Sequence, residues 1–164
     1  MKLYIRQKVF SFGAKFNITD EYGEERYRVE GEVFTFAPKL HIFDVTGNEV
    51  ALVQRKLLSL MPRFYVYVDG EQIAEIIKEI TFLKQKYDII GKGWTVDGDF
   101  TAHDYSIKSN GDEIARIHKV WMSWGDSFEL DIRDTDDEVV LIAVILAIDA
   151  VMDAGNSRAG YSTT

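Results

Sequence analysis

The residues best placed to do chemistry are two acids near the C-terminal end of the sequence. Asp149 and Asp153 are four residues apart, a spacing that puts both carboxylates on one face of a helix. The dipole of a helix is negative at its C-terminus, so acids there need a compensating partner. Two interpretations stay open. The carboxylates accept hydrogen bonds from strand-end amides and lock the helix in place, or they form a small polar site at the mouth of a barrel.

The histidines and the known motifs offer little support for catalysis. His41, His103 and His118 are far apart and each falls within a strand-like run, which favours strand-face residues over metal ligands. The sequence has no nucleophile elbow, phosphate-binding loop, dinucleotide fingerprint or zinc-protease motif. The acidic run "DIRDTDDE" lacks the central glycine and the ligand spacing of a calcium-binding loop. We therefore expect a protein that is not an enzyme and that holds no metal or cofactor.

A candidate binding surface comes from the uneven distribution of charge. The net charge is −8, yet residues 54–92 contain seven lysines and arginines against five acids. This local excess leaves room for a basic patch around Arg55, Lys56, Arg63, Lys84 and Lys86. The alternative is that these side chains belong to ordinary solvated strand faces.

The remaining composition limits the class of protein. Residues 93–164 contain five lysines and arginines against 14 acids, which argues against a general nucleic-acid binder. The absence of cysteine suits a reducing compartment, and the first 16 residues lack the apolar run of a signal peptide, so we expect a cytoplasmic protein. A chain of 164 residues has the size of one domain.

Short alternating segments predict the elements that position these residues. From residue 3 to about residue 133, runs rich in aromatic and β-branched residues are separated by turns. Four similar hairpin units have turn glycines at Gly23, Gly47, Gly70 and Gly111. About twelve strands in such a meander favour a closed antiparallel barrel, because closure removes exposed edges. In "EQIAEIIKEITFLKQK" the isoleucine spacing also fits a helix, and only the repeated unit favours a strand.

The segment "TDDEVVLIAVILAIDAVMDAG" predicts a helix over residues 136–154. Thr135 and Glu138 have the spacing of a capping box, and Gly155 is placed to end the helix. The 14 residues from Val139 to Met152 would span about 21 Å, too short for a hydrocarbon core of about 30 Å, so we do not expect a transmembrane helix. A helix that is apolar on every side is buried on every side. We therefore expect it at the centre of the barrel, with a domain over residues 1–155 and a disordered tail over residues 156–164.

Several segments together resemble the LURP-one-related family, including its bacterial YxjI-like members. They are "MKLYIRQKVFSFGAKFNITDEYG", "VEGEVFTFAPKLHIFDVTGNEV", "RKLLSLMPRFYVYVDG" and the terminal "AIDAVMD". The likeness extends from Met1 to about Gly155. It implies the tubby C-terminal-like fold, a twelve-stranded barrel enclosing a hydrophobic C-terminal helix.

For function, the resemblance implies binding rather than catalysis. Tubby domains bind phosphoinositides through a basic surface patch, and the related phospholipid scramblases act at membranes. No tubby lipid-binding motif is present here, so no residue is carried over from it. The resulting hypothesis is a non-enzymatic module that recognises anionic phospholipid headgroups through its outer surface. The candidate residues for the lipid headgroup are Arg55, Lys56, Arg63, Lys84 and Lys86. The alternative is an intracellular scaffold whose acidic half meets a protein partner.

Overall fold

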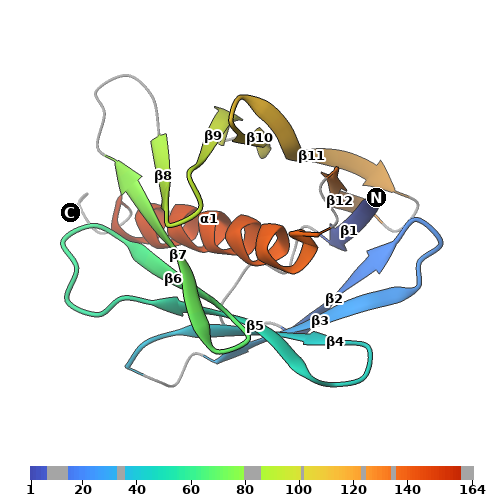
Figure 1. The fold of residues 1–164 in the computed structure, drawn as a ribbon, viewed down its shortest axis with the longest axis horizontal. Coiled ribbons are helices and arrows are strands. Elements are labelled where there is room, and N and C mark those ends of the chain that lie inside the picture. Colours follow the sequence, from blue (N-terminus) through green and yellow to red (C-terminus); the bar gives the residue numbers. More distant parts are fainter. Residues whose placement is uncertain are drawn as a thin grey trace.

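The chain forms a closed antiparallel barrel around one helix in the computed structural model (Figure 1). The structure describes residues 1–6, 15–32, 36–79, 86–100, 102–122, 125–133 and 136–159. The strands in these ranges are β1 (Lys2–Arg6), β2 (Lys15–Asp20), β3 (Glu25–Glu32), β4 (Lys39–Asp44), β5 (Glu49–Arg55), β6 (Arg63–Val68), β7 (Glu71–Glu79), β8 (Lys86–Ile90), β9 (Trp94–Asp99), β10 (Asp104–Ser109), β11 (Asp112–Met122) and β12 (Gly125–Ile132). Each strand pairs with the next, and β1 closes the barrel against β12. The predicted barrel is confirmed.

The four predicted hairpins are present, and each turn has a local cause. Gly70 and Gly111 follow Asp69 and Asn110, and all four residues have positive φ, as two-residue hairpin turns require. In the β4–β5 turn, one carboxylate oxygen of Asp44 accepts the backbone N–H groups of Thr46 and Asn48 at 2.9 Å each. Asp20 does the same in the β2–β3 turn. These local bonds let the turns set the meander independently of the core.

Alternation along the strands places one set of side chains inside the barrel. In β6, Phe64 and Val66 are fully buried while their neighbours are half-buried. The segment that also fitted a helix forms β7 up to Glu79, and Ala74 and Ile76 point inward from it. The strand prediction is therefore confirmed over these residues. Period-two burial against the helix outweighed the local helical spacing.

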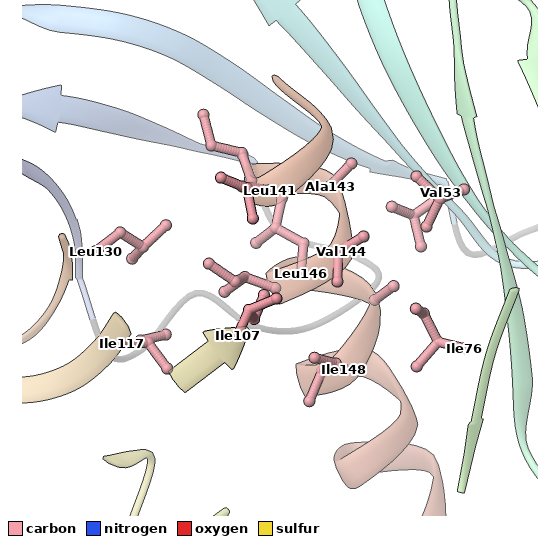
Figure 2. Close-up of a cluster of buried hydrophobic side chains, with 14 of the residues drawn as sticks. Val53, Ile76, Ile107, Ile117, Leu130, Leu141, Ala143, Val144, Leu146 and Ile148 are labelled. Atoms are coloured by element: carbon pink, nitrogen blue, oxygen red, sulfur yellow. The ribbon is translucent and has the colours of Figure 1, made fainter. Parts of the chain in front are cut away.

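The helix α1 (Glu138–Ala159) occupies the centre of the barrel. Every residue from Leu141 to Ile148 is fully buried, as an all-apolar helix requires. Figure 2 shows the side chains of α1 lying between Leu130, Ile117 and Ile107 on one side and Val53 and Ile76 on the other. Among the described residues, no helix is long and apolar enough to cross a membrane.

Both ends of α1 differ from the prediction. The helix begins at Glu138, and the backbone carbonyl of Asp137 accepts a hydrogen bond from the N–H of Leu141 at 2.8 Å; the predicted capping residue Thr135 lies outside the described residues. Glu138 accepts a bond from the Tyr27 hydroxyl at 2.9 Å. Gly155 does not end the helix, which continues to Ala159, so the tail predicted to be disordered is helical over residues 156–159. A glycine inside a helix costs only about 1 kcal/mol, and no proline follows it.

Candidate functional site

The candidate residues that the structure describes, from both sets, lie at one end of the barrel. Because neighbouring strands are antiparallel, the connections after the odd-numbered strands all lie at the same end. The helix enters from the opposite end, where Lys92 contacts Asp137 at 2.9 Å, and therefore ends among these connections. Figure 1 shows the end of α1 and the β5–β6 connection on the same side, at the left. We call this end the C-terminal mouth.

Three of the five predicted cations come together at the C-terminal mouth. Arg55 ends β5 and Arg63 begins β6, and the backbone N–H of Lys56 donates to the carbonyl oxygen of Arg63 at 2.9 Å. The Arg63 guanidinium lies 3.3 Å from the carboxylate of Glu75, and the Lys56 ammonium lies 3.9 Å from it. We refer to Arg55, Lys56 and Arg63 as the mouth surface.

Aromatic and backbone contacts hold the mouth surface in place. The Lys56 ammonium lies 5.4 Å from the centre of the Tyr65 ring, within the range of a cation–π interaction. The backbone N–H of Arg55 donates to the carbonyl oxygen of Pro38 at 3.0 Å. Arg55 pairs with the buried Phe64 across the ladder, so its side chain starts on the inward face, at the rim. Arg55 and Lys56 thus leave the backbone on different sides of the same strand end.

A hollow of about 240 Å³ lies beside the mouth surface. Its lining is formed by Arg55, Lys56, Phe36, Pro38 and the connection over residues 57–59 and 61–62. The Nε of Arg63 is buried and has no hydrogen-bond partner among the described residues. Of the three cations, Arg55 and Lys56 line the hollow, and Glu75 is the described carboxylate that contacts Lys56 and Arg63, so the net charge of the mouth surface is positive. This arrangement can hold an anionic group at the rim.

The other two predicted cations cannot be placed as side chains. Lys84 lies outside the described residues. Lys86 is the first residue of β8, where it pairs with Glu79 of β7, but its side chain is outside the described part. Its backbone position is at the same end of the barrel as the mouth surface.

Asp149 is buried and its carboxylate binds a histidine. The Nε2 of His103 lies 2.9 Å from the Oδ1 of Asp149, which is only 3% exposed. The His103 ring also packs on Phe128, with 4.7 Å between ring centres. The prediction that His103 lies within a strand is wrong, because it occupies the β9–β10 turn with φ of +52°. Asp149 thus contacts an imidazole from another element, and the predicted bonds from strand-end amides stay a prediction. The side chain of Asp153 is outside the described part.

The buried acid affects two tyrosines around it. Burial, together with the negative charge of Asp149, raises the pKa of Tyr87 to about 12. The same two causes, with a smaller contribution from Tyr87, raise the pKa of Tyr105 well above its ordinary value. Phe100 lies between the two, with ring centres 4.5 Å from Tyr87 and 5.1 Å from Tyr105. At neutral pH both tyrosines are uncharged, so this region favours packing over acid–base chemistry.

The remaining histidines lie on strands, as predicted. His41 in β4 contacts Glu49 at 2.6 Å and Glu32 at 3.3 Å, and His118 in β11 lies 3.7 Å from Glu129. In the part of the chain that the structure describes, no three histidines or acids are arranged to hold a metal ion.

Sequence reasoning missed two features of the mouth. Glu75 lies 12 residues after Arg63 and reaches it only through the β6–β7 pairing. His103 and Asp149 are 46 residues apart. No local spacing rule predicts either pair. Predicting these contacts from the sequence would have required knowledge of the strand register.

Comparison with known proteins agrees with this architecture. The family model described as LURP-one-related matches residues 1–149. A Bacillus subtilis (strain 168) protein named "Uncharacterized protein YxjI" is 32% identical over 152 residues, covering 93% of this chain and 94% of that protein. The crystal structure of an Arabidopsis thaliana protein matches with a TM-score of 0.65 and 17% identity, covering 92% of this chain and 90% of that one. The fold is of the tubby C-terminal-like type, and the chain belongs to the LURP-one-related family.

Proposed function

We propose that this protein is a non-enzymatic module that binds anionic phospholipid headgroups at the mouth surface. The observation that carries the proposal is that Arg55 and Lys56 line one hollow, with Arg63 bonded to Lys56 beside it. Among the described residues, Glu75 is the carboxylate that contacts this surface. A surface of clustered lysine and arginine side chains suits a phosphate group.

The filled interior supports a ligand site on the outside or at the rim. The barrel lumen is occupied by α1, whose residues Leu141–Ile148 are fully buried. Removing the helix would expose these side chains, at roughly 1.5–3 kcal/mol for each of the larger ones. A ligand inside the barrel, as in a lipocalin, would have to meet this cost.

The expected affinity is modest and depends on salt. A lysine or arginine near an anionic membrane contributes on the order of 1 kcal/mol, and the effect falls off within a Debye length of about 8 Å at physiological ionic strength. Three cations, partly compensated by Glu75, therefore give weak, reversible association with membranes. Binding would weaken as salt is raised.

Co-sedimentation with vesicles tests the proposal. We expect the purified protein to sediment with phosphatidylcholine vesicles that contain phosphatidylserine or a phosphoinositide, and much less with phosphatidylcholine alone. Combining Arg55→Glu with Lys56→Glu should abolish most of this binding, because attraction becomes repulsion. Lys108→Glu is the matched control, since Lys108 has similar exposure, contacts Asp97 at 3.1 Å and lies toward the opposite end. Equal loss in the control, or no binding at all, would refute the proposal.

A protein-interaction domain is the second candidate function. The acidic excess of residues 93–164 would suit a cationic protein partner. This function predicts indifference to vesicles of any composition. The same co-sedimentation therefore separates the two candidates.

A further inference from the structure

The β5–β6 connection exposes apolar side chains that the fold does not need. Among the described residues, eight large apolar side chains are exposed. Three of them, Leu57, Leu58 and Leu60, lie in this connection. A fourth, Phe36 of the β3–β4 connection, lines the same hollow as Leu57 and Leu58. Three of these four are at least 95% exposed. The other four, Met1, Tyr22, Val45 and Ile90, are scattered over different elements. Single exposed apolar residues are ordinary on a protein surface, but a cluster marks an interaction site.

The backbone of this connection holds the cluster outward. The bond from the Lys56 N–H to the Arg63 carbonyl closes the base of the loop, and Pro62 restricts its return. Leu58 has φ of +54°, a conformation that leucine rarely adopts and that glycine or asparagine tolerates. Folding alone therefore gives no reason for leucine at position 58. We call Leu57, Leu58 and Leu60 the apolar loop.

Charge around the apolar loop identifies its partner. The nine residues from Arg55 to Arg63, "RKLLSLMPR", include three cations and no acid, in a chain with a net charge of −8. The cations lie at the two ends of the loop and the leucines at its centre. An anionic bilayer is complementary to this arrangement, because its negatively charged headgroups lie at the surface and an apolar region lies beneath them.

We propose that the apolar loop inserts into the outer part of an anionic lipid bilayer while Arg55, Lys56 and Arg63 contact the headgroups. This inference rests on the proposed function and narrows it. The ligand is a lipid within a membrane. A free phosphate or a soluble headgroup would bind weakly, because it has no apolar part that the leucines could contact. Phe36, which lines the same hollow as Leu57 and Leu58, lies beside the insertion site.

A single environment-sensitive dye tests insertion directly. The chain has no cysteine, so Leu58→Cys provides one labelling site for nitrobenzoxadiazole. We expect its emission to shift to the blue and to rise severalfold when phosphatidylserine-containing vesicles are added. Val45→Cys is the matched control, because Val45 is an exposed apolar residue in the β4–β5 turn at the opposite end. Its dye should not change.

The outcomes separate insertion from headgroup binding. If the labelled protein sediments with vesicles but the dye at position 58 does not change, insertion is refuted and the proposed function stands. If the protein does not sediment with any vesicle, both fail. A shift that occurs without vesicles and rises with protein concentration would show that a second copy covers the apolar loop, which also overturns the inference.

A substitution separates insertion from stability. Leu58→Asn suits the left-handed backbone, so the melting temperature should not fall, while vesicle binding should weaken roughly tenfold because one leucine no longer leaves water. The control Val45→Asn should leave vesicle binding unchanged. Unchanged binding by Leu58→Asn would contradict insertion.

Discussion

At the residue scale, Glu75 sets how much positive charge the mouth surface can offer. Its carboxylate is shared by Arg63 and Lys56, at 3.3 and 3.9 Å, while no described carboxylate contacts Arg55. The shared pairs are partly exposed, so each contributes little to stability. Their larger consequence is that two of the three cations are partly neutralised before any ligand arrives. Under the proposed function, Glu75 therefore lowers the affinity of the mouth surface for anionic headgroups.

Removing the negative charge of Glu75 should strengthen binding to anionic vesicles. We expect Glu75→Gln to increase the affinity for phosphatidylserine-containing vesicles about fivefold, because roughly 1 kcal/mol of attraction is restored. Co-sedimentation at low salt measures the change. Glu113→Gln is the matched control, since Glu113 is a similarly half-buried carboxylate that contacts Arg133 at 2.7 Å on another part of the barrel. Unchanged or weaker binding by Glu75→Gln would contradict the role of the mouth surface.

Tyr87 gives a prediction for alkaline pH. Burial, with a smaller contribution from Asp149, raises its pKa to about 12 in the folded protein, from 10.0 for the free side chain. The uncharged phenol is favoured by the fold, so its contribution to stability is complete below pH 10 and is lost as pH rises toward 12. The free energy of unfolding should fall over this range, and Tyr87→Phe should make the fall shallower. Chemical denaturation at a series of pH values measures it, and an identical slope in the variant would show that Tyr87 is not responsible.

At the element scale, the His103–Asp149 contact joins the C-terminal half of α1 to the β9–β10 turn. The middle of the helix packs through apolar side chains, and such packing is not directional. A hydrogen bond from a fixed imidazole adds a specific position along the helix axis. We therefore propose that Asp149 is a structural residue that sets the depth of the helix in the barrel.

A double-mutant cycle tests the lock. Asp149→Ala and His103→Ala should each lower the free energy of unfolding. The decrease in the double variant should be about 1 kcal/mol smaller than the sum of the two single decreases, because either substitution alone already removes the hydrogen bond. Urea denaturation of the two single variants and the double variant measures the coupling. Effects that add to within about 0.5 kcal/mol would show that the two side chains stabilise the fold independently.

At the scale of the whole molecule, the sequence predicted the fold because its signals were local. The hairpins follow from turns such as Asp69–Gly70 and Asn110–Gly111, and the central helix follows from an unbroken apolar run. The end of the helix was missed, because a glycine costs a helix only about 1 kcal/mol and so does not by itself end one. The site was predicted in part. The sequence placed Arg55, Lys56 and Arg63 close together along the chain, but Glu75 and His103 reach their partners only through strand register and helix depth.

The architecture of the whole molecule is compatible with the proposed membrane binding without a conformational change. The closed ladder and the filled lumen leave the connections at the C-terminal mouth as the place where cations and leucines meet. Under the proposed function, the barrel would hold both at one end, facing the same membrane, and binding would need no change in the core.

The most direct test of this account is co-sedimentation of the unmodified protein with vesicles of phosphatidylcholine, with and without phosphatidylserine, at low and high salt. We predict strong sedimentation only with the anionic vesicles at low salt, and a several-fold decrease at high salt that leaves a residual fraction held by the leucines. The absence of sedimentation in all four conditions would contradict the account and favour a protein partner at the mouth.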